Sequence, residues 1–239
     1  MDQIKELQNL IESSHKIVFF TGAGISTESN IPDFRSTTGL YNQEYAYPPE
    51  TILSHHFFIS NTSEFYRFYR NKMIYTDALP NIAHQCIARL EDMGKCLGVI
   101  TQNIDNLHQE AGSKHVIELH GTVYHNHCTT CNKEYSLEDI LNKELVPLCN
   151  CGGIIKPDVI LYEEALNEKD IDEALSMIMN ADLLIVCGTS LSVYPAAGFL
   201  RYFKGEHLVL LNKTATPYDN QADLIIQDTL GHIFSQIHI

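Results

Sequence analysis

Short apolar runs of strand length alternate with segments of helical periodicity along most of the chain. Apolar residues recur at helical spacing within residues 4–11, and this segment leads directly into the apolar run 16–20. Runs of the same kind occur at residues 96–100, 116–119, 181–187, 207–211 and 222–226. Strands that are buried on both faces read as continuous apolar runs. The alternation therefore predicts an α/β fold whose parallel sheet is covered by helices on both faces.

Two of the segments between these runs have an apolar stripe of helical spacing. The stripe predicts a helix over residues 80–93 and a second helix over residues 167–180. The stripe residues are Ile82, Cys86, Ile87 and Leu90 in the first helix, and Ile171, Leu175 and Ile178 in the second.

Two stretches of the chain lack this alternation of strand and helix patterns. Residues 37–75 are rich in Tyr and Phe, and residues 124–155 contain two close pairs of cysteines and few large apolar side chains. Neither stretch has the pattern of the sheet, so both are interpreted as insertions that build a smaller domain. The predicted division is a large domain from residues 1–36, 76–122 and 156–239, and a small domain from 37–75 and 123–155.

The composition narrows the class of protein. With 44% hydrophobic and 19% charged residues the chain has ordinary globular usage. Its net charge is −14 and it has no block of basic residues, so nonspecific binding to nucleic acid or to a membrane surface is not expected. No apolar run approaches the length of a membrane span and no signal peptide is evident. The odd number of cysteines, seven, argues against a disulfide framework and predicts a cytoplasmic protein.

Four of the cysteines have the spacing of a metal site. Cys128 and Cys131 form one pair, Cys149 and Cys151 form another, and 17 residues lie between the pairs. Two thiolate pairs at this separation are typical of a structural tetrahedral zinc site. The second pair is one residue shorter than usual, which leaves His125 or His127 as an alternative ligand, and a pair of free or redox-active thiols as the alternative to zinc.

Polar and glycine-rich turns follow several of the predicted strands. Gly22, Ala23 and Gly24 begin a phosphate-binding turn in which Thr27 replaces the third glycine of the dinucleotide fingerprint. Gly188, Thr189 and Ser190 follow another strand, and Asn212 ends the next one. The carboxyl edge of an open α/β sheet binds ligands, so these turns predict a nucleotide site; plain turn chemistry is the alternative for each one alone.

A further polar group, Gln102, Asn103 and Asp105, follows the strand at 96–100. Asp105 also has the position of a helix cap. His120, which follows the run 116–119, is a candidate general base, although the chain has 12 histidines and sequence alone does not single it out.

Taken in order along the chain, these motifs resemble the sirtuin family of NAD-dependent protein lysine deacylases. The matching segments are Gly22-Ala-Gly-Ile-Ser-Thr27, Ile31-Pro-Asp-Phe-Arg35, Thr101-Gln-Asn-Ile-Asp105, Leu119-His-Gly121, the cysteine pairs, Lys156-Pro-Asp-Val-Ile160 and Gly188-Thr-Ser190. The resemblance covers about residues 14–228. It implies a Rossmann-like domain, a small domain made of a helical module and a zinc ribbon, and a cleft in which NAD meets an acyl-lysine peptide.

The resemblance also implies site residues. For NAD these are Ala23, Thr27, Phe34, Arg35, Gln102, Ile104, Asp105, Thr189, Ser190, Asn212 and Asp228. His120 matches the family's catalytic base, with Asn103 and Asp105 beside it, and Ile160 and Tyr162 match the residues that sandwich the substrate lysine. Members that remove succinyl groups have Tyr-x-x-Arg, in place of which this chain has Tyr66 and Tyr69, with Arg70 one position late. The resemblance therefore predicts that acetyl or other neutral acyl groups are removed, with Tyr66 near the substrate.

Three other functions compete with this one. A mono-ADP-ribosyltransferase or NAD glycohydrolase would cleave the same cofactor, but His120 and the apolar pair Ile160 and Tyr162 favour deacylation. A dehydrogenase would need the third glycine and an acidic residue about 20 positions on, which the chain lacks. A zinc-ribbon module that binds NAD without turnover has no need of the polar set around Asn103 and Asp105.

Overall fold

The computed structural model of the chain describes residues 3–36, 39–43, 45–143 and 145–239. The remaining positions of the predicted small domain, 37–38, 44 and 144, lie outside the described residues. None of the helices in the described ranges has the length and apolar composition of a membrane span.

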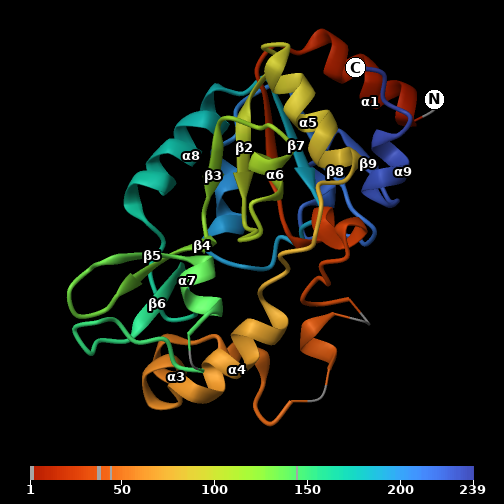
Figure 1. The fold of residues 1–239 in the computed structure, drawn as a ribbon. Coiled ribbons are helices and arrows are strands. Elements are labelled where there is room, and N and C mark those ends of the chain that lie inside the picture. Colours follow the sequence, from red (N-terminus) through yellow and green to blue (C-terminus); the bar gives the residue numbers. More distant parts are fainter. Residues whose placement is uncertain (1–2, 37–38, 44, 144) are drawn as a thin grey trace.

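Six parallel strands form the larger sheet (Figure 1). They are β1 (Ile17–Thr21), β2 (Cys96–Thr101), β3 (Val116–Glu118), β7 (Leu183–Cys187), β8 (His207–Leu211) and β9 (Leu224–Ile226). Their order is β3-β2-β1-β7-β8-β9, so the chain leaves β1 in one direction toward β2 and later returns on its other side to form β7. Neighbours pair in parallel register; Phe19, for example, lies opposite Val99 and Ile185. The predicted parallel sheet is confirmed.

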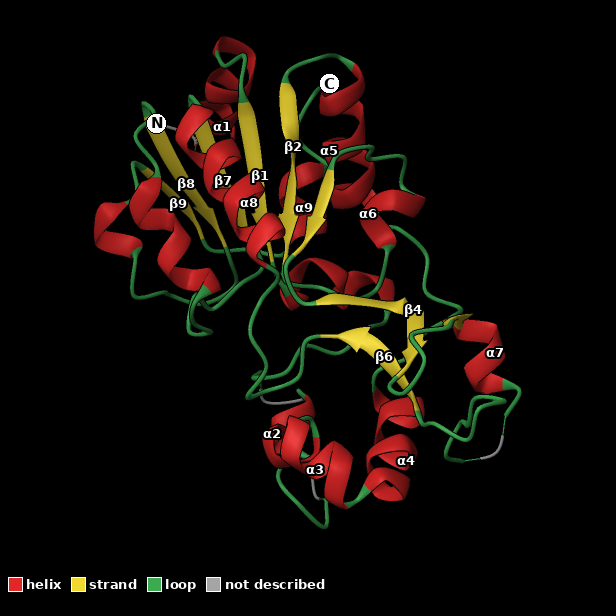
Figure 2. Cartoon of the chain, turned by 90° about the vertical axis from the view of Figure 1, so that its left-hand side faces the viewer, coloured by secondary structure: helices red, strands yellow, loops and turns green. Residues whose placement is uncertain are grey.

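Helices cover both faces of this sheet, because successive side chains of a strand point to opposite faces. Phe19 packs on the side of α1 (Gln3–Ser13), α5 (Ile82–Asp92) and α9 (Leu230–Phe234). Phe20 packs on the side of α8 (Glu168–Asn180) and the 3-10 helix η3 (Ala196–Tyr202). Figures 1 and 2 show α5 and α8 on opposite sides of the strands.

One position of the predicted stripe is wrong. Ile82 is 40% exposed, whereas Ile87 and Leu90 are buried in the core. Ile82 is the first residue of α5, directly after the cap Asn81, whose side-chain oxygen accepts from the backbone N–H of Ala83. The buried side of this first turn is formed by Ala83 and His84, and Ile82 lies on its solvent side.

A second, three-stranded antiparallel sheet forms the centre of the smaller part (Figure 2). Its strands are β4 (Gly121–Cys128), β5 (Glu134–Ser136) and β6 (Ile155–Val159), in the order β5-β4-β6. β4 begins at Gly121 and β6 ends at Val159, and these two residues pair. The strands of the small sheet therefore include residues 121–122 and 156–159, which were predicted to belong to the large domain.

Short helices from two distant segments pack on the small sheet. They are α2 (Pro49–Ile52), α3 (His55–Ser60), α4 (Thr62–Lys72) and α7 (Leu137–Leu141). Phe65 and Tyr69 of α4 share one apolar cluster with Val123 of β4 and Ile155 of β6. The aromatic-rich segment and the cysteine-bearing segment therefore share one core. We call the part of the molecule formed by the three strands β4, β5 and β6 and the four helices α2, α3, α4 and α7 the small module.

The order of the large sheet determines where a ligand can bind. β1 is the point at which the chain reverses its direction of strand addition, and ligands of open α/β sheets bind outside the carboxyl ends of the strands at such a point. The glycine turns and the polar segment after β2 all follow the carboxyl ends of β1, β7 and β2. The small module lies below that edge in Figure 2.

Candidate active site

The two glycine turns lie against each other. The N–H of Gly22 donates to the carbonyl of Cys187 over 3.1 Å, and the N–H of Gly24 donates to the carbonyl of Gly188 over 2.7 Å. A Cβ atom at Gly24 would lie 2.7 Å from the Cα atom of Gly188, and Gly188 itself has φ +60°. Side chains at these positions would force the turns apart, so the glycines are required for the close approach.

Polar side chains connect the turn after β7 to the neighbouring strands. The N–H of Thr189 donates to Oδ1 of Asn212 over 2.8 Å, and Nε2 of Gln102 donates to Oγ1 of Thr189 over 3.0 Å. Asn212 is only 8% exposed, and its Nδ2 atom has no hydrogen-bond partner among the described residues. A buried amide donor without a partner is costly, so this one is available to a ligand.

A buried polar group lies at the carboxyl end of β2. Oγ of Ser26 donates to Oδ2 of Asp105 over 2.7 Å and accepts from Nδ2 of Asn103 over 3.0 Å. Asp105 also accepts over 3.1 Å from the N–H of Leu107, the first residue of α6 (Leu107–Glu110), although the N-cap position of this helix is Asn106. Burial raises the pKa of Asp105, and the hydrogen bonds from Ser26 and Leu107 oppose that rise. The contacts of Asp105 are therefore consistent with a functional role and with a local hydrogen bond at the start of α6.

The surroundings of His120 determine its tautomer. Its Nδ1 atom lies 2.9 Å from the carbonyl oxygen of Gln102. A carbonyl only accepts, so Nδ1 carries the proton and Nε2 keeps its lone pair. Burial lowers the pKa of His120, partly offset by this bond, so the imidazole is neutral near pH 7.

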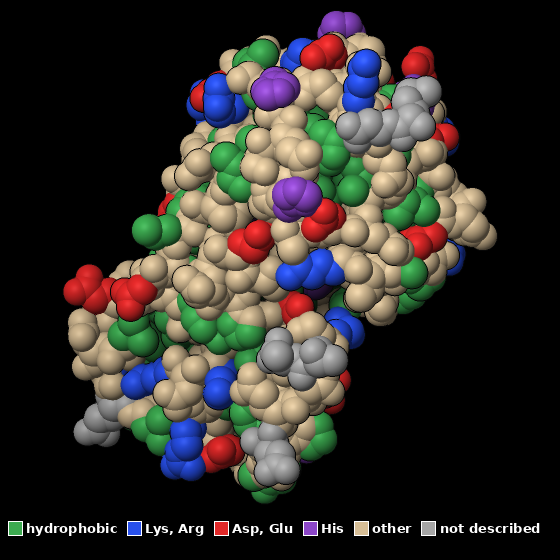
Figure 3. Space-filling view, turned by 90° about the vertical axis from the view of Figure 1, so that its right-hand side faces the viewer, with side chains coloured by type: hydrophobic (Ala, Val, Ile, Leu, Met, Phe, Trp, Pro, Cys, Tyr) green, Lys and Arg blue, Asp and Glu red, His purple; other side chains and the backbone are tan. Residues whose placement is uncertain are grey.

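One cavity of about 550 Å³ brings these groups together. Residues from the large sheet and from the small module line it, and Figure 3 shows the molecule narrowing where its larger and smaller parts meet. Of the residues singled out from sequence, the cavity is lined by Gly22, Ala23, Gly24, Thr27, Phe34, Arg35, Gln102, Asn103, Ile104, Asp105, His120, Ile160, Tyr162, Gly188, Thr189, Ser190, Asn212 and Asp228.

Asp228 also lines the cavity. Its carboxylate accepts from the N–H of Thr229 over 2.7 Å and lies 2.5 Å from Nδ1 of His232. The hydrogen bond with His232 lowers the pKa of Asp228, so this carboxylate is ionised at neutral pH.

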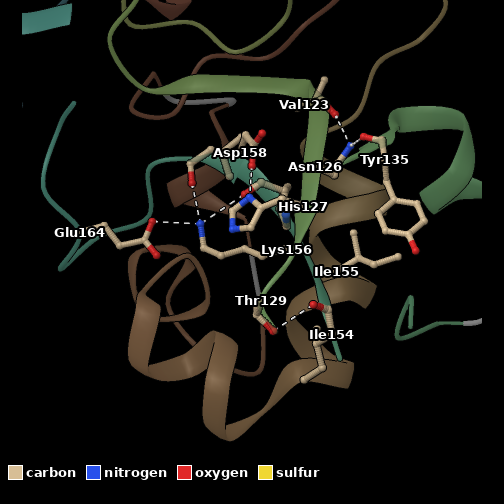
Figure 4. A network of polar contacts seen from close by, with 12 residues as sticks. Val123, Asn126, His127, Thr129, Tyr135, Ile154, Ile155, Lys156, Asp158 and Glu164 are labelled. Atoms are coloured by element: carbon tan, nitrogen blue, oxygen red, sulfur yellow. Dashed lines mark hydrogen bonds and ion pairs between the residues drawn. The ribbon is translucent and has the colours of Figure 1, made fainter. Parts of the chain in front are cut away.

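The segment after β6 brings Ile160 and Tyr162 to the cavity. The N–H of Ile160 donates to the carbonyl of His120 over 2.9 Å, which joins the segment to the candidate base. Lys156 supports the same segment, because its Nζ atom donates to the carbonyl of Val159 over 3.0 Å and to Glu164 over 3.1 Å (Figure 4). The positions of both apolar side chains thus depend on the small sheet.

Tyr66 does not line the cavity, so the expected contact with substrate is wrong. It is completely buried, and its hydroxyl donates to the carbonyl of Ile155 within the small module. Tyr69, one helical turn on, lines the cavity instead. Arg70 points elsewhere: its guanidinium donates to the carbonyls of Ile140 and Lys143 at the end of α7.

The four paired cysteines converge. Their sulfur atoms all lie within 4.8 Å of one another, and Sγ of Cys151 lies 3.5 Å from Sγ of both Cys128 and Cys131. Zinc bound tetrahedrally at about 2.3 Å from each sulfur requires separations of about 3.8 Å, so the donor set fits this ion. The short second pair does reach the cluster. His127 lies outside it and contacts Asp158 (Figure 4).

Ser26 is a site residue that the sequence motifs did not indicate. It is completely buried and is the only side chain that hydrogen-bonds to both Asn103 and Asp105 among the described residues. The sequence shows that Ser26 lies in the turn after β1. It does not show that this turn contacts the segment after β2, because that contact depends on the parallel register of β1 and β2.

Residues 22–195 match the model of the Sir2 family. A protein of Clostridium acetobutylicum named NAD-dependent protein deacetylase is 54% identical over 241 residues, covering 99% of this chain and 98% of the relative. A protein of Clostridium tetani with the same name is 57% identical over 241 residues, again covering 99% of this chain and 98% of the relative.

Solved structures are similar over almost the whole chain. A Sir2 structure with deacetylated p53 peptide and 3′-O-acetyl-ADP-ribose has a TM-score of 0.90 at 40% identity, covering 98% of this chain and 96% of that chain. The structure of Sir2Tm bound to a propionylated peptide has a TM-score of 0.89 at 40% identity, covering 99% of this chain and 97% of that chain.

Proposed function

Because the chain belongs to the Sir2 family, we propose that it is an NAD-dependent protein deacetylase that removes acetyl groups from lysine side chains. The observation that carries the proposal is the single cavity in which a neutral histidine, a buried carboxylate and two apolar side chains lie beside paired glycine turns. These are the groups that a reaction between NAD and an acyl-lysine peptide requires.

The residues around the glycine turns fit NAD, the co-substrate. The close turns at Gly22 and Gly188 present backbone rather than side chains, which suits the approach of phosphate groups. The unpartnered Nδ2 atom of Asn212 and the carboxylate of Asp228 suit ribose hydroxyls. When bound, NAD supplies an electrophilic ribose carbon after nicotinamide leaves. Phe34 and Arg35 lie on the segment that would cover this carbon.

His120 is proposed as the general base. The bond from its Nδ1 atom to Gln102 leaves Nε2 as the proton acceptor, and burial keeps the ring neutral. The Nε2 lone pair takes a proton from a hydroxyl group presented in the cavity. Gln102 therefore acts as a positioning residue for His120.

Asn103 and Asp105 are proposed to orient the amide of the leaving nicotinamide. Their side chains are tied together through Ser26, so neither rotates freely. A carboxylate and an amide that are held in place can fix an amide ligand in one orientation, which contributes to catalysis through positioning.

Ile160 and Tyr162 are proposed to contact the apolar stem of the acylated lysine. An acylated lysine has no charge, so its stem can lie between such side chains without a desolvation penalty for an ammonium group. The acidic surface of the chain, with a net charge of −14, favours protein substrates that have basic segments.

Zinc would have a structural role in this protein. The four cysteine sulfurs would hold the ion, and four protein ligands would leave no position for a reacting group. A cytoplasmic location is proposed because an odd number of cysteines, seven, argues against a disulfide framework.

Mass spectrometry of an acetyl-lysine peptide tests the proposed reaction. The purified protein is expected to remove acetyl only when NAD is present and to release nicotinamide and O-acetyl-ADP-ribose, and His120→Ala is expected to lose this activity. Consumption of NAD while the peptide keeps its acetyl group would favour ADP-ribosyl transfer or NAD hydrolysis. Binding of NAD without any turnover would favour a sensor module.

We also propose a preference for neutral acyl groups. The guanidinium of Arg70 donates to two backbone carbonyls of the α7 end, and Tyr69 takes the place beside the cavity. A succinyl carboxylate would then enter without the arginine that neutralises it in desuccinylating members. Acetyl and propionyl peptides should react at least tenfold faster than a succinyl peptide of the same sequence; equal rates would contradict this preference.

A further inference from the structure

A pair of tyrosine hydroxyls joins the two sides of the cavity. The hydroxyl oxygens of Tyr41 and Tyr162 lie 2.5 Å apart, and both residues line the cavity. Tyr162 lies on the segment after β6, beside the proposed path of the acyl-lysine. Tyr41 lies in the 3-10 helix η2 (Leu40–Asn42), 121 positions earlier in the chain.

Tyr41 contacts both residues expected to cover NAD on this side. Its ring meets the ring of Phe34 edge to face, with centroids 5.4 Å apart, and the Arg35 guanidinium lies 5.3 Å from its centroid. The backbone N–H of Tyr41 also donates to the carbonyl of Phe34 over 2.8 Å. The place of Phe34 and Arg35 therefore depends on where the Tyr41 ring lies.

Tyr162 is held independently of Tyr41. Its N–H donates to the carbonyl of Leu53 over 2.9 Å, and its carbonyl accepts from the N–H of His55 over 3.0 Å, so the backbone is fixed on both sides by the small module. Tyr162 is 37% exposed. Its backbone is thus anchored, while its ring projects to where an acyl-lysine would pack.

We propose that the hydrogen bond between Tyr41 and Tyr162 is a positioning link that couples the acyl-lysine side of the cavity to the NAD side. The inference rests on the proposed function. An acyl-lysine stem that packs on Tyr162 reduces the motion of the Tyr162 ring. Through the hydrogen bond, the motion of Tyr41 is reduced as well, and with it the motion of Phe34 and Arg35, which contact Tyr41. A dinucleotide that binds next orders fewer side chains, so it binds more tightly. By linkage, the dinucleotide tightens peptide binding by the same factor.

Substitution of either tyrosine by phenylalanine tests the link, because the ring and its packing remain and only the hydroxyl is lost. The probe is ADP-ribose, which has no nicotinamide to release, titrated calorimetrically with and without an acetyl-lysine peptide. In the wild type the peptide is expected to tighten ADP-ribose binding. Tyr41→Phe, Tyr162→Phe and the double variant should each weaken peptide-assisted binding by about three- to tenfold, the effect of one hydrogen bond.

The double variant is decisive. If the two hydroxyls act as one bond, the double variant binds no more weakly than either single variant. Tyr45→Phe is the matched control: its hydroxyl donates to Gln43 over 2.7 Å, it comes from the same part of the chain, and it does not line the cavity. This control should keep the wild-type affinity and the wild-type response to peptide.

The link would be overturned if the two substitutions reduced the affinity for ADP-ribose additively, or if the variants bound ADP-ribose as tightly as the wild type. The deacetylase proposal would remain intact in either case if the wild type still deacetylates the peptide. A wild type that neither binds ADP-ribose nor deacetylates would overturn both. Equal weakening with and without peptide would also overturn the coupling, because it would show that the hydroxyls act on the NAD side alone.

Discussion

At the scale of single residues, burial acts in opposite directions on the acid and the base of the cavity. It lowers the pKa of His120 and raises the pKa of Asp105, since in each case the charged form loses hydration. The partners decide the outcome. His120 has a single carbonyl partner and remains neutral, whereas Asp105 accepts hydrogen bonds from Ser26 and Leu107 that favour the carboxylate.

The acid side of the pH profile follows from His120. The base works only when neutral, and its pKa is lowered from the ordinary value of 6.5, so activity should persist below pH 6.5 and fall only as the pH drops through the lowered pKa. The measurement is kcat/KM for an acetyl-lysine peptide against pH, with ADP-ribose binding followed over the same range as a control. An acid limb centred above pH 6.5 would contradict the tautomer and burial of His120.

Ser26→Ala tests the polar group at the end of β2. It removes a hydrogen bond to a carboxylate, which is worth about 1.5–3 kcal/mol, so kcat/KM should fall by about ten- to a hundredfold. Ser29→Ala is the control, because Ser29 is also buried in the 3-10 helix η1 (Ala23–Ser29), accepts from Asn81 and does not line the cavity. If the two variants lose activity equally, the contact between Ser26 and Asp105 has no special role.

At the scale of elements, a buried histidine pair joins α5, α6 and β1. His84 of α5 and His108 of α6 have ring centroids 4.8 Å apart, and both are almost completely buried. Nδ1 of His84 accepts from the N–H of Asn81, the cap of α5, and Nε2 of His108 lies 3.0 Å from Oγ1 of Thr21 at the end of β1. The pair therefore braces the elements that carry the glycine turn and the polar segment.

This pair should make the fold sensitive to acid. Burial lowers the pKa of His84 to about 4, so between pH 6.5 and pH 4 the unfolded chain binds a proton that the folded chain does not. The stability due to neutral His84 is complete above pH 6.5 and is lost as the pH falls, by about 3 kcal/mol at pH 4. Urea unfolding at several pH values measures the decline.

His84→Gln should show lower stability at pH 7 and a shallower decline with acid, because the proton uptake of the unfolded state is removed. His15→Gln, at an exposed position, should decline as steeply as the wild type. An unchanged slope in His84→Gln would assign the acid sensitivity to other groups.

At the scale of the whole molecule, the cavity depends on two parts that are stabilised differently. The large sheet has apolar clusters on both faces, whereas the small module combines one apolar cluster with the four cysteines. Tyr66 and Arg70 of α4 donate to backbone carbonyls of β6 and of the end of α7. The helical segment and the cysteine-bearing segment therefore share contacts, so a change that destabilises one segment should also destabilise the other.

Removal of zinc tests this connection. The protein should contain one zinc ion per chain, and a strong chelator or Cys151→Ser should abolish deacetylation because the small module loses its order. Hydrogen exchange followed by mass spectrometry should show lost protection in β4, β6 and α4, with protection kept in β1, β7 and β8. Cys86→Ala, in the core of the large part, should retain zinc. Full activity after verified removal of the metal would contradict the structural role.

Apolar periodicity determined the architecture from the sequence alone. Each apolar run is short and continuous because both faces of its strand are covered, so the strands of the large sheet were predicted with ends correct to within about two residues. The cysteine spacing predicted the metal site, and the motif resemblance predicted the family and most of the singled-out residues that line the cavity, with Tyr66 wrong and Ser26 missed. These features are local in sequence or repeat along it, which is why they are readable without coordinates.

Contacts between distant segments were decided only by the tertiary structure. The direction of Tyr66 and Arg70 depends on the packing of α4 against β6 and α7, the contact of Ser26 with Asp105 depends on the register of β1 and β2, and the pairing of Tyr41 with Tyr162 depends on how the small module lies against the cavity. A sequence pattern repeats every two or 3.6 residues and so indicates which face of an element is buried. It contains no information on which residue of another element lies opposite, because that is determined by how whole elements pack together.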